Sequence, residues 1–366
     1  MDMVWLIDWV DEPLAKLVIG LAIGAAFGIV AQRSAFCTRS AVIELFSGKI
    51  DRQLPLWLAA FAAAIAGMQF LIHAGAIDVS ETRFFSSPQS LSGAIVGGGL
   101  FGLGMILARG CASRLLVLGA SGNLRALFSV VLLAIAVFFT LEGPAAPLRS
   151  AIASVWNTSA IGGNDLLESM GATSYLAVAA ALTALAAGLV SSVRRQLPVT
   201  HIVGGLAIGV LIPAAWYLSW SLSTQVFEPF QPDGLSFIRP FSGSIELLAS
   251  GGSQDMFSID VGLVGGAIVG AFATAILFGD FRVQTFNTPG SAPFWRYAAG
   301  ALLMGFGGVL AAGCTIGAGF TGGSVLAISS LLSLSSMILA AGISHRLIDI
   351  CSHEATQPTP HPLPAE

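Results

Sequence analysis

The sequence predicts an all-α polytopic membrane protein with about nine transmembrane helices and additional short re-entrant helices. Of the 366 residues, 55% are hydrophobic and only 10% are charged, and the mean hydropathy is +0.83. A soluble domain has about 25% charged residues. Several apolar runs also exceed about 18 residues, the length at which a helix crosses the hydrocarbon layer of a bilayer. A lipid bilayer is therefore the expected environment, and nothing in the composition indicates nucleic-acid binding.

The apolar runs define a single transmembrane domain over 1–350. We predict two repeats, about 14–141 and about 199–349, joined by a connector helix at 172–191, and a disordered cytoplasmic tail at 351–366. The first residues, "MDMVWLIDWVDEP", are acidic where a cleavable signal peptide has a basic segment. The predicted spans cover about 14–32, 56–76, 91–108, 124–141, 172–191, 199–219, 259–278, 296–312 and 331–349.

Loop charges orient these spans, because basic residues concentrate on the cytoplasmic side of a membrane protein. Four basic residues, Lys16, Arg83, Arg149 and Arg239, fall on one predicted side. The other twelve fall on the opposite side, which predicts an outside N-terminus and a cytoplasmic C-terminus. They are Arg33, Arg39, Lys49, Arg52, Arg109, Arg114, Arg125, Arg194, Arg195, Arg282, Arg296 and Arg346.

Two internal matches indicate that the repeats are related. "GLAIG" occurs at 20–24 and at 205–209, and "LFGLGMILARGC" at 100–111 aligns with "LMGFGGVLAAGC" at 303–314. The loop charges make the matching spans run in opposite directions. Inverted repeats with glycine-broken segments at matching positions indicate a substrate site near the middle of the membrane.

Three segments are too polar or too glycine-rich for a helix that faces lipid. They are "AQRSAFCTRSAV" at 31–42, "ARGCASRLLVLGASGN" at 108–123 and "AAGCTIGAGFTGGS" at 311–324. Non-helical backbone at membrane depth occurs only where protein or a water-filled cavity surrounds it. We therefore predict re-entrant breaks, and each contains one cysteine: Cys37, Cys111 and Cys314.

The residue types at the breaks suit a small anion. The short helices that follow would direct backbone N–H groups at the break, Thr315 adds a hydroxyl, and glycine permits close approach of the backbone. The glycines concerned are Gly110, Gly313 and Gly317. A buried cysteine is often only a small hydrophobic residue, and this is the interpretation we give Cys351, which lies outside the breaks. For glycine-rich spans such as Gly97–Gly104 and Gly262–Gly270, close helix packing is the alternative.

Three arginines, Arg39, Arg109 and Arg114, flank the two breaks predicted on the cytoplasmic side. They are candidates for attracting an anion, although the concentration of basic residues on the cytoplasmic side also explains them. The segment "SFIRPFSGS" at 236–244 is a candidate fourth break. No CxxC pair, metal-ligand spacing or nucleotide-binding motif is present, so we expect no metal and no cofactor.

The segments "SAFCTRSAV", "ARGCASR" and "AAGCTIGAG", in this order, resemble the YeeE/YedE family of bacterial sulfur-compound transporters over roughly 14–350. The resemblance implies an inner-membrane protein with an hourglass-like inverted-repeat architecture that imports thiosulfate. It also implies that Cys37, Cys111 and Cys314 line the path, and that a TusA-like sulfur-carrier protein is a cytoplasmic partner. Cys111 departs from the pattern of Cys314, since Ala-Ser-Arg follows it in place of a nearby glycine.

Thiol chemistry is consistent with this function. A neutral S–H group is a weak donor that can meet the soft terminal sulfur of thiosulfate, while backbone N–H groups take the sulfonate oxygens. Several weak sites in a row allow both binding and release. Two alternatives stay open: a membrane sulfurtransferase with a persulfide cysteine, and a transporter of another small anion with structural cysteines. The resemblance also leaves open which sulfur or selenium anion is the substrate.

Overall fold

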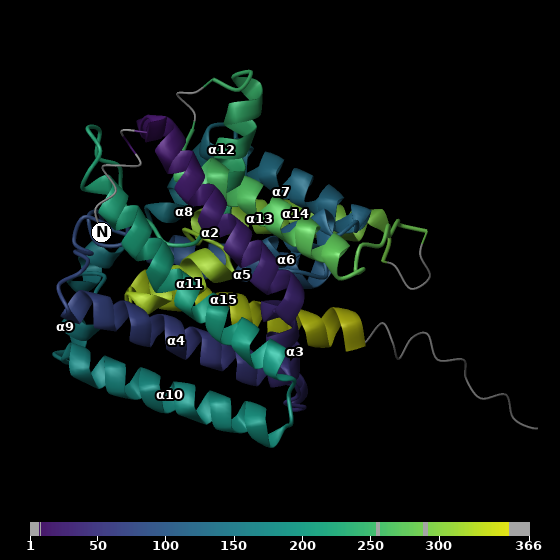
Figure 1. Cartoon of the computed structure of the whole chain (residues 1–366), viewed down its shortest axis with the longest axis horizontal. Helices are drawn as coiled ribbons and strands as arrows, with labels where there is room; N and C mark the ends of the chain where they lie inside the picture. The colour runs from purple at the N-terminus through teal and green to yellow at the C-terminus, as the bar shows by residue number, and fades with distance from the viewer. Residues whose placement is uncertain (1–6, 8, 254–256, 288–291, 351–366) are drawn as a thin grey trace, which may run out of the picture.

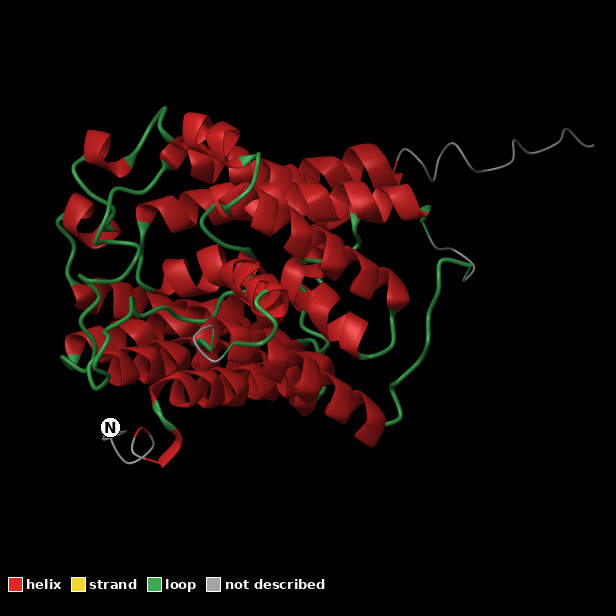
Figure 2. Ribbon diagram, turned by 90° about the horizontal axis from the view of Figure 1, so that it is seen from above, coloured by secondary structure: helices red, strands yellow, loops and turns green. Residues whose placement is uncertain are grey.

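The computed structural model of the chain describes residues 7, 9–253, 257–287 and 292–350. Within these residues every regular element is a helix, and strand-like pairing is limited to three isolated bridges (Figure 2). Nine helical segments of the described chain are long and apolar enough to cross a membrane. The predicted class, an all-α polytopic membrane protein, is confirmed. Cys351 and the tail at 351–366 lie outside the described residues.

The helices follow the order shown in Figure 1. The first part of the chain contains α2 (Glu12–Ser34), α3 (Thr38–Ser47), α4 (Gln53–His73), α5 (Leu91–Leu107), α6 (Ala112–Ala120) and α7 (Leu124–Leu141). Between the halves lie α8 (Ala146–Ala153), η1 (Thr158–Ile161), α9 (Leu166–Met170) and α10 (Ser174–Arg194). The second part contains α11 (Val199–Ser223), α12 (Ile238–Ala249), α13 (Ile259–Leu277), α14 (Phe294–Leu310), η3 (Thr315–Gly322), α15 (Ile328–Ser344) and η4 (His345–Ile350).

Each predicted break is followed by a short helix. α3, α6 and η3 begin directly after Cys37, Cys111 and Cys314. The third of these is a π-helix and not the α-helix that the other two form. The fourth candidate segment also contains a short helix, α12, which starts two residues after Ser236.

Glycine stripes bring α2 and α13 into direct backbone contact. A methyl group added at any of six glycines would lie 2.2–2.3 Å from a carbonyl oxygen of the facing helix. Small residues four apart let membrane helices approach this closely, so packing accounts for them. The six are Gly20, Gly24 and Gly28 on α2 and Gly262, Gly266 and Gly270 on α13.

The remaining long helices pair around the same centre. α5 lies between α14 and α15, α14 also contacts α7, and α11 contacts both α4 and α2. α10 packs on α4 at the edge of the bundle, and most of its side chains are exposed (Figure 1). The interior contains large buried aromatic side chains, including Phe101, Trp216, Phe237 and Phe320.

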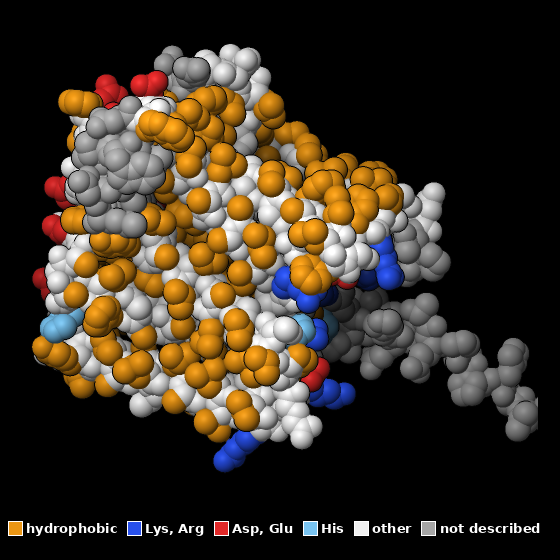
Figure 3. Space-filling model, viewed as in Figure 1, with side chains coloured by type: hydrophobic (Ala, Val, Ile, Leu, Met, Phe, Trp, Pro, Cys, Tyr) orange, Lys and Arg blue, Asp and Glu red, His pale blue; other side chains and the backbone are white. Residues whose placement is uncertain are grey.

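The two ends of the bundle differ in charge. We name them the Arg83 end and the Arg109 end, after the arginines that line one cavity at each. α5 leads from the first end to the second, and its 17 residues span about 25 Å at the rise of an α-helix. In Figure 3, Lys and Arg side chains gather on one side of the molecule, while most Asp and Glu side chains lie on the opposite side.

Candidate functional site

Cys111 and Cys314 follow turns that share one backbone pattern. After α5, the Gly110 N–H donates to the Met105 carbonyl at 3.1 Å, and after α14 the Gly313 N–H donates to the Gly308 carbonyl at 2.9 Å. The residue before each glycine is left-handed, with φ of 60° and 55°. This arrangement closes a helix C-terminus. Each cysteine is then the extended N-cap of the next short helix.

Two glycines at the second turn permit close contacts that a side chain would block. A Cβ added to Gly313, whose φ is 157°, would lie 2.5 Å from the Ala318 nitrogen. A Cβ added to Gly317 would lie 2.4 Å from Ser236 Oγ. The close backbone approach predicted at these glycines is therefore present. Through Gly317, the loop before α12 reaches the turn that carries Cys314.

The three break cysteines come together although they are far apart in the sequence. Cys314 and Cys111 are buried, with 0% and 2% exposure, and Cys37 is half-buried. Cys111 lies within electrostatic range of both Cys37 and Cys314, and the Thr315 hydroxyl lies beside its thiol. Ser113 Oγ is 3.5 Å from Cys111 Sγ. The structure thus forms one cluster of thiols and hydroxyls from both halves of the chain.

Backbone amides and two hydroxyls surround this cluster. Cys314 Sγ accepts from the Gly317 N–H at 3.4 Å, and the Phe237 amide also faces it. The hydroxyl of Ser236 is buried without a partner, and the buried hydroxyl of Thr315 has the Cys111 thiol beside it. A buried hydroxyl left unpaired costs about 1–3 kcal/mol. A solute that carries acceptor oxygens would satisfy these donors.

The turn that carries Cys37 depends on a side chain of α4. Gln53 Oε1 accepts from the Cys37 N–H at 3.2 Å, and Gln53 Nε2 donates to the carbonyl of Ala35, which is left-handed with φ 50°. Glu44 of α3 in turn accepts from four backbone N–H groups at 2.9–3.2 Å. These four belong to residues 51–54, at the start of α4, so α3 and α4 fix each other.

The predicted arginines occupy different positions. Arg114 Nη1 donates to the Ala31 carbonyl at 3.3 Å and so connects α6 to α2. Arg39 is half-buried on α3, whereas Arg109 is exposed. Arg109 lines a 160 Å³ cavity, as do Arg125 and Tyr297, and none of the three cysteines in the described part of the chain lines it. The three arginines flank the two cytoplasmic breaks in the sequence, and in the structure Arg109 faces a separate cavity.

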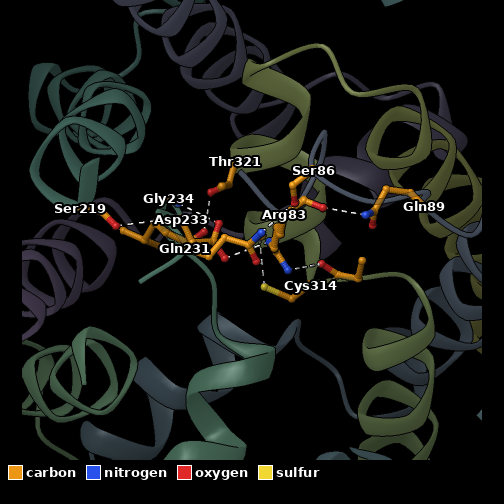
Figure 4. Close-up of polar contacts among 12 residues, drawn as sticks. Arg83, Ser86, Gln89, Ser219, Gln231, Asp233, Gly234, Cys314 and Thr321 are labelled. Atoms are coloured by element: carbon orange, nitrogen blue, oxygen red, sulfur yellow. Dashed lines mark hydrogen bonds and ion pairs between the residues drawn. The ribbon is translucent and has the colours of Figure 1, made fainter. Parts of the chain in front are cut away.

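A second cavity reaches the Cys314 turn from the Arg83 end. Its volume is 270 Å³, and Ser236 and Gly313 are part of its wall. Three arginines, Arg83, Arg149 and Arg239, also line it, and the Asp233 carboxylate lies beside the first of them, 2.9 Å from Arg83 Nε. Figure 4 shows Arg83 beside Asp233. The three arginines outnumber this carboxylate, and an excess of positive charge favours small anions in the cavity.

The sequence pattern does not reveal several of these contacts. Arg83 contributes only to the predicted topology, and neither Gln53 nor Asp233 belongs to a predicted break. One feature of the sequence could have indicated this cavity. Its arginines, Arg83, Arg149 and Arg239, are isolated basic residues in polar segments between apolar runs. Ser236 was included in the candidate fourth break, but its neighbour, Gly317, is 81 residues away in the sequence.

Helices that break at a buried cluster of thiols, hydroxyls and amides, below a cavity lined by arginines, define a membrane transport protein for a small solute. The model of a family described as sulphur transport matches residues 33–343. The chain belongs to this family, and the resemblance stated from the cysteine segments is confirmed.

Two relatives are similar along most of their length, and both carry the name thiosulfate transporter TsuA. The protein from Escherichia coli (strain K12) is 27% identical over 325 residues, which are 83% of this chain and 86% of the relative. The protein from Spirochaeta thermophila (strain ATCC 700085 / DSM 6578 / Z-1203) is 30% identical over 322 residues, which are 81% and 88% of the two chains.

Proposed function

We propose that this chain transports thiosulfate, or a closely related sulfur anion, into the cytoplasm along a path lined by Cys37, Cys111 and Cys314. The observation that carries the proposal is the cluster of these three thiols with the Thr315 hydroxyl beside Cys111 and the unpartnered hydroxyl of Ser236. S–H groups can meet the terminal sulfur, while O–H and N–H donors take the sulfonate oxygens. The names of the two relatives support thiosulfate as the substrate.

Other predicted residues have supporting roles in this proposal. Gly110, Gly313 and Gly317 shape the turns, and Thr315 offers its hydroxyl between Cys111 and Cys314. The arginines Arg39, Arg109 and Arg114 provide positive charge near the cytoplasmic opening. We further propose the two inverted repeats at 14–141 and 199–349, joined by the connector helix at 172–191. The matching turns before Cys111 and Cys314 support this division.

Transport explains the surroundings of Cys111 better than a sulfurtransferase reaction does. A nucleophilic thiol is activated by an adjacent base, and the side chains recorded beside Cys111 belong to Ser113 and Thr315. Neither of these hydroxyls is a base. We propose that a TusA-like carrier receives the imported sulfur compound in the cytoplasm, as the resemblance implies.

We propose a location in the bacterial inner membrane, with the N-terminus and the Arg83 end outside and the C-terminus in the cytoplasm. The asymmetry of the basic residues supports this orientation.

The orientation predicts the behaviour of two C-terminal fusions. A green fluorescent protein fused after Glu366 should be bright, and alkaline phosphatase at the same position should be inactive, because only the first matures in the cytoplasm. Cell fluorescence and phosphatase activity at equal expression provide the measurement. A dark fluorescent fusion together with an active phosphatase would reverse the orientation.

The thiol cluster predicts that the path prefers thiosulfate to sulfate because it recognises the terminal sulfur and not only the charge. Sulfate has the same charge as thiosulfate and nearly the same shape, but it lacks the terminal sulfur. We expect thiosulfate to be preferred by about 10- to 100-fold, which corresponds to about 1.4–2.7 kcal/mol. The measurement is uptake of labelled thiosulfate into vesicles at increasing sulfate concentration. Half-inhibition by sulfate at the thiosulfate concentration itself would show that the path recognises charge and size alone.

A further inference from the structure

The Arg83 side chain connects segments that are far apart in the sequence (Figure 4). Its Nε lies 2.9 Å from Asp233 Oδ2, and its Nη1 donates to the Ala312 carbonyl at 2.9 Å. The guanidinium also lies over the Phe84 ring, 4.5 Å from the centroid. The Arg83 and Asp233 side chains are only 12% and 19% exposed. The ion pair is therefore largely shielded from water.

Asp233 is itself held from both sides. Its backbone N–H donates to Ser219 Oγ on α11 at 3.1 Å, and its Oδ1 accepts from the Gly234 N–H at 2.8 Å. Two residues later, the Leu235 carbonyl accepts from Thr321 Oγ1 on η3 at 2.6 Å. The loop with Asp233 is thus anchored to α11 and to η3, and it provides a fixed position for the carboxylate.

The contact with Ala312 is significant because of where this residue lies. Ala312 is left-handed, with φ 55°, and stands two residues before Cys314. A non-glycine residue keeps this conformation only when its surroundings impose it. Its N–H bonds within the turn to the Val309 carbonyl, and its own carbonyl accepts from Arg83. Arg83 therefore secures the turn from outside at Ala312, while Ser333 Oγ of α15 donates to the neighbouring Ala311 carbonyl at 3.1 Å.

We infer that Arg83 and Asp233 are positioning residues for Cys314. The carboxylate fixes the guanidinium, and the guanidinium fixes the turn that presents the Cys314 thiol below the arginine-lined cavity. The guanidinium meets Asp233 as an ion pair at Nε and bonds to the Ala312 carbonyl through Nη1, so two different nitrogens of one planar group make the two contacts, which the single nitrogen of a lysine cannot do. The inference rests on the proposed function only for its uptake measurement, since its second measurement needs no substrate.

Opposite charge changes separate positioning from simple attraction of the anion. Arg83→Gln removes a positive charge from the cavity, and Asp233→Asn removes a negative one. If the charges acted only by attracting the anion, Arg83→Gln would take up thiosulfate more slowly than the parent and Asp233→Asn would take it up faster. Positioning predicts that both lower the maximal rate of thiosulfate uptake by at least about tenfold, because small displacements of an aligned group are costly. Arg83→Lys keeps the charge and should give an intermediate rate.

Thiol labelling tests the geometry without substrate. In a purified full-length chain with Cys37→Ser, Cys111→Ser and Cys351→Ser, a neutral maleimide reports the accessibility of Cys314. Arg83→Gln and Asp233→Asn should each raise the labelling rate by at least about fivefold, because the buried turn opens locally. Arg149→Gln removes a charge from the same cavity without touching Ala312, so the rate should stay within about twofold of that of the parent.

A second chain, in which Cys37 is the only cysteine, controls for folding. Its labelling rate should not change in Arg83→Gln or Asp233→Asn. If the labelling rates of both Cys37 and Cys314 rise, the Arg83–Asp233 ion pair supports the whole fold and a specific positioning role is rejected. An unchanged Cys314 rate in both variants, or uptake by Asp233→Asn at the parental rate or faster, also overturns the inference. Failure of thiosulfate uptake in the parent chain would contradict the proposed function and leave the labelling result standing.

Discussion

Replacing Cys111 or Cys314 by alanine should lower the initial rate of thiosulfate uptake by about 100-fold, or ~2.7 kcal/mol of barrier. Both thiols are buried, and Cys111 lies within electrostatic range of the other two break cysteines. Removing either one therefore interrupts the proposed series of weak sites. Cys37→Ala should also reduce uptake strongly. Labelled thiosulfate uptake into vesicles at matched expression measures all three variants.

Serine and Cys351 provide the controls for this result. Serine keeps a hydroxyl donor but lacks the polarizable sulfur, so Cys111→Ser and Cys314→Ser should recover little uptake. Cys351 was predicted to lie outside the breaks, and Cys351→Ala should transport normally. Normal uptake by both Cys111→Ala and Cys314→Ala would remove the thiols from the mechanism, even if the chain transports thiosulfate.

Gly266→Ala should strongly destabilise the α2–α13 pair. The added methyl group would lie 2.2 Å from the Leu21 carbonyl oxygen. Neither helix backbone can give way locally, so the helices must separate. Overpacking typically costs about 1–3 kcal/mol and sometimes more. We expect a lower thermal unfolding midpoint in detergent and a reduced yield of monodisperse protein, which size-exclusion chromatography would measure.

Gly265→Ala on the same helix is a matched control. Its methyl group would lie 3.5 Å from Leu21 Cδ2, an ordinary contact with a flexible side chain. Both substitutions change intrinsic helix propensity by the same amount, so the difference between them isolates the backbone contact. Equal unfolding midpoints for Gly266→Ala and Gly265→Ala would show that the helices are not as close as the structure indicates.

The sequence alone was sufficient for the spans, the breaks and the family. A span is a local property, since about 20 apolar residues in a row match the bilayer thickness. The breaks were equally local, because glycine, hydroxyl and charged residues around Cys37, Cys111 and Cys314 do not suit lipid. All three cysteines do stand at helix starts. The glycine stripe at 262–270 was also consistent with close packing, but its partner helix was not predictable.

Only the tertiary structure decided which groups meet at these breaks. Thr315 lies beside Cys111, Gln53 holds the Cys37 turn, and Arg83 bonds to Ala312 across 229 residues of sequence. The tertiary structure also placed Arg109 at a cavity that Cys37, Cys111 and Cys314 do not line. Apolar run length and residue type set where a helix starts and stops. Which loop reaches which turn depends on how the helices cross, and backbone contacts such as those of Gly20 and Gly262 determine that crossing.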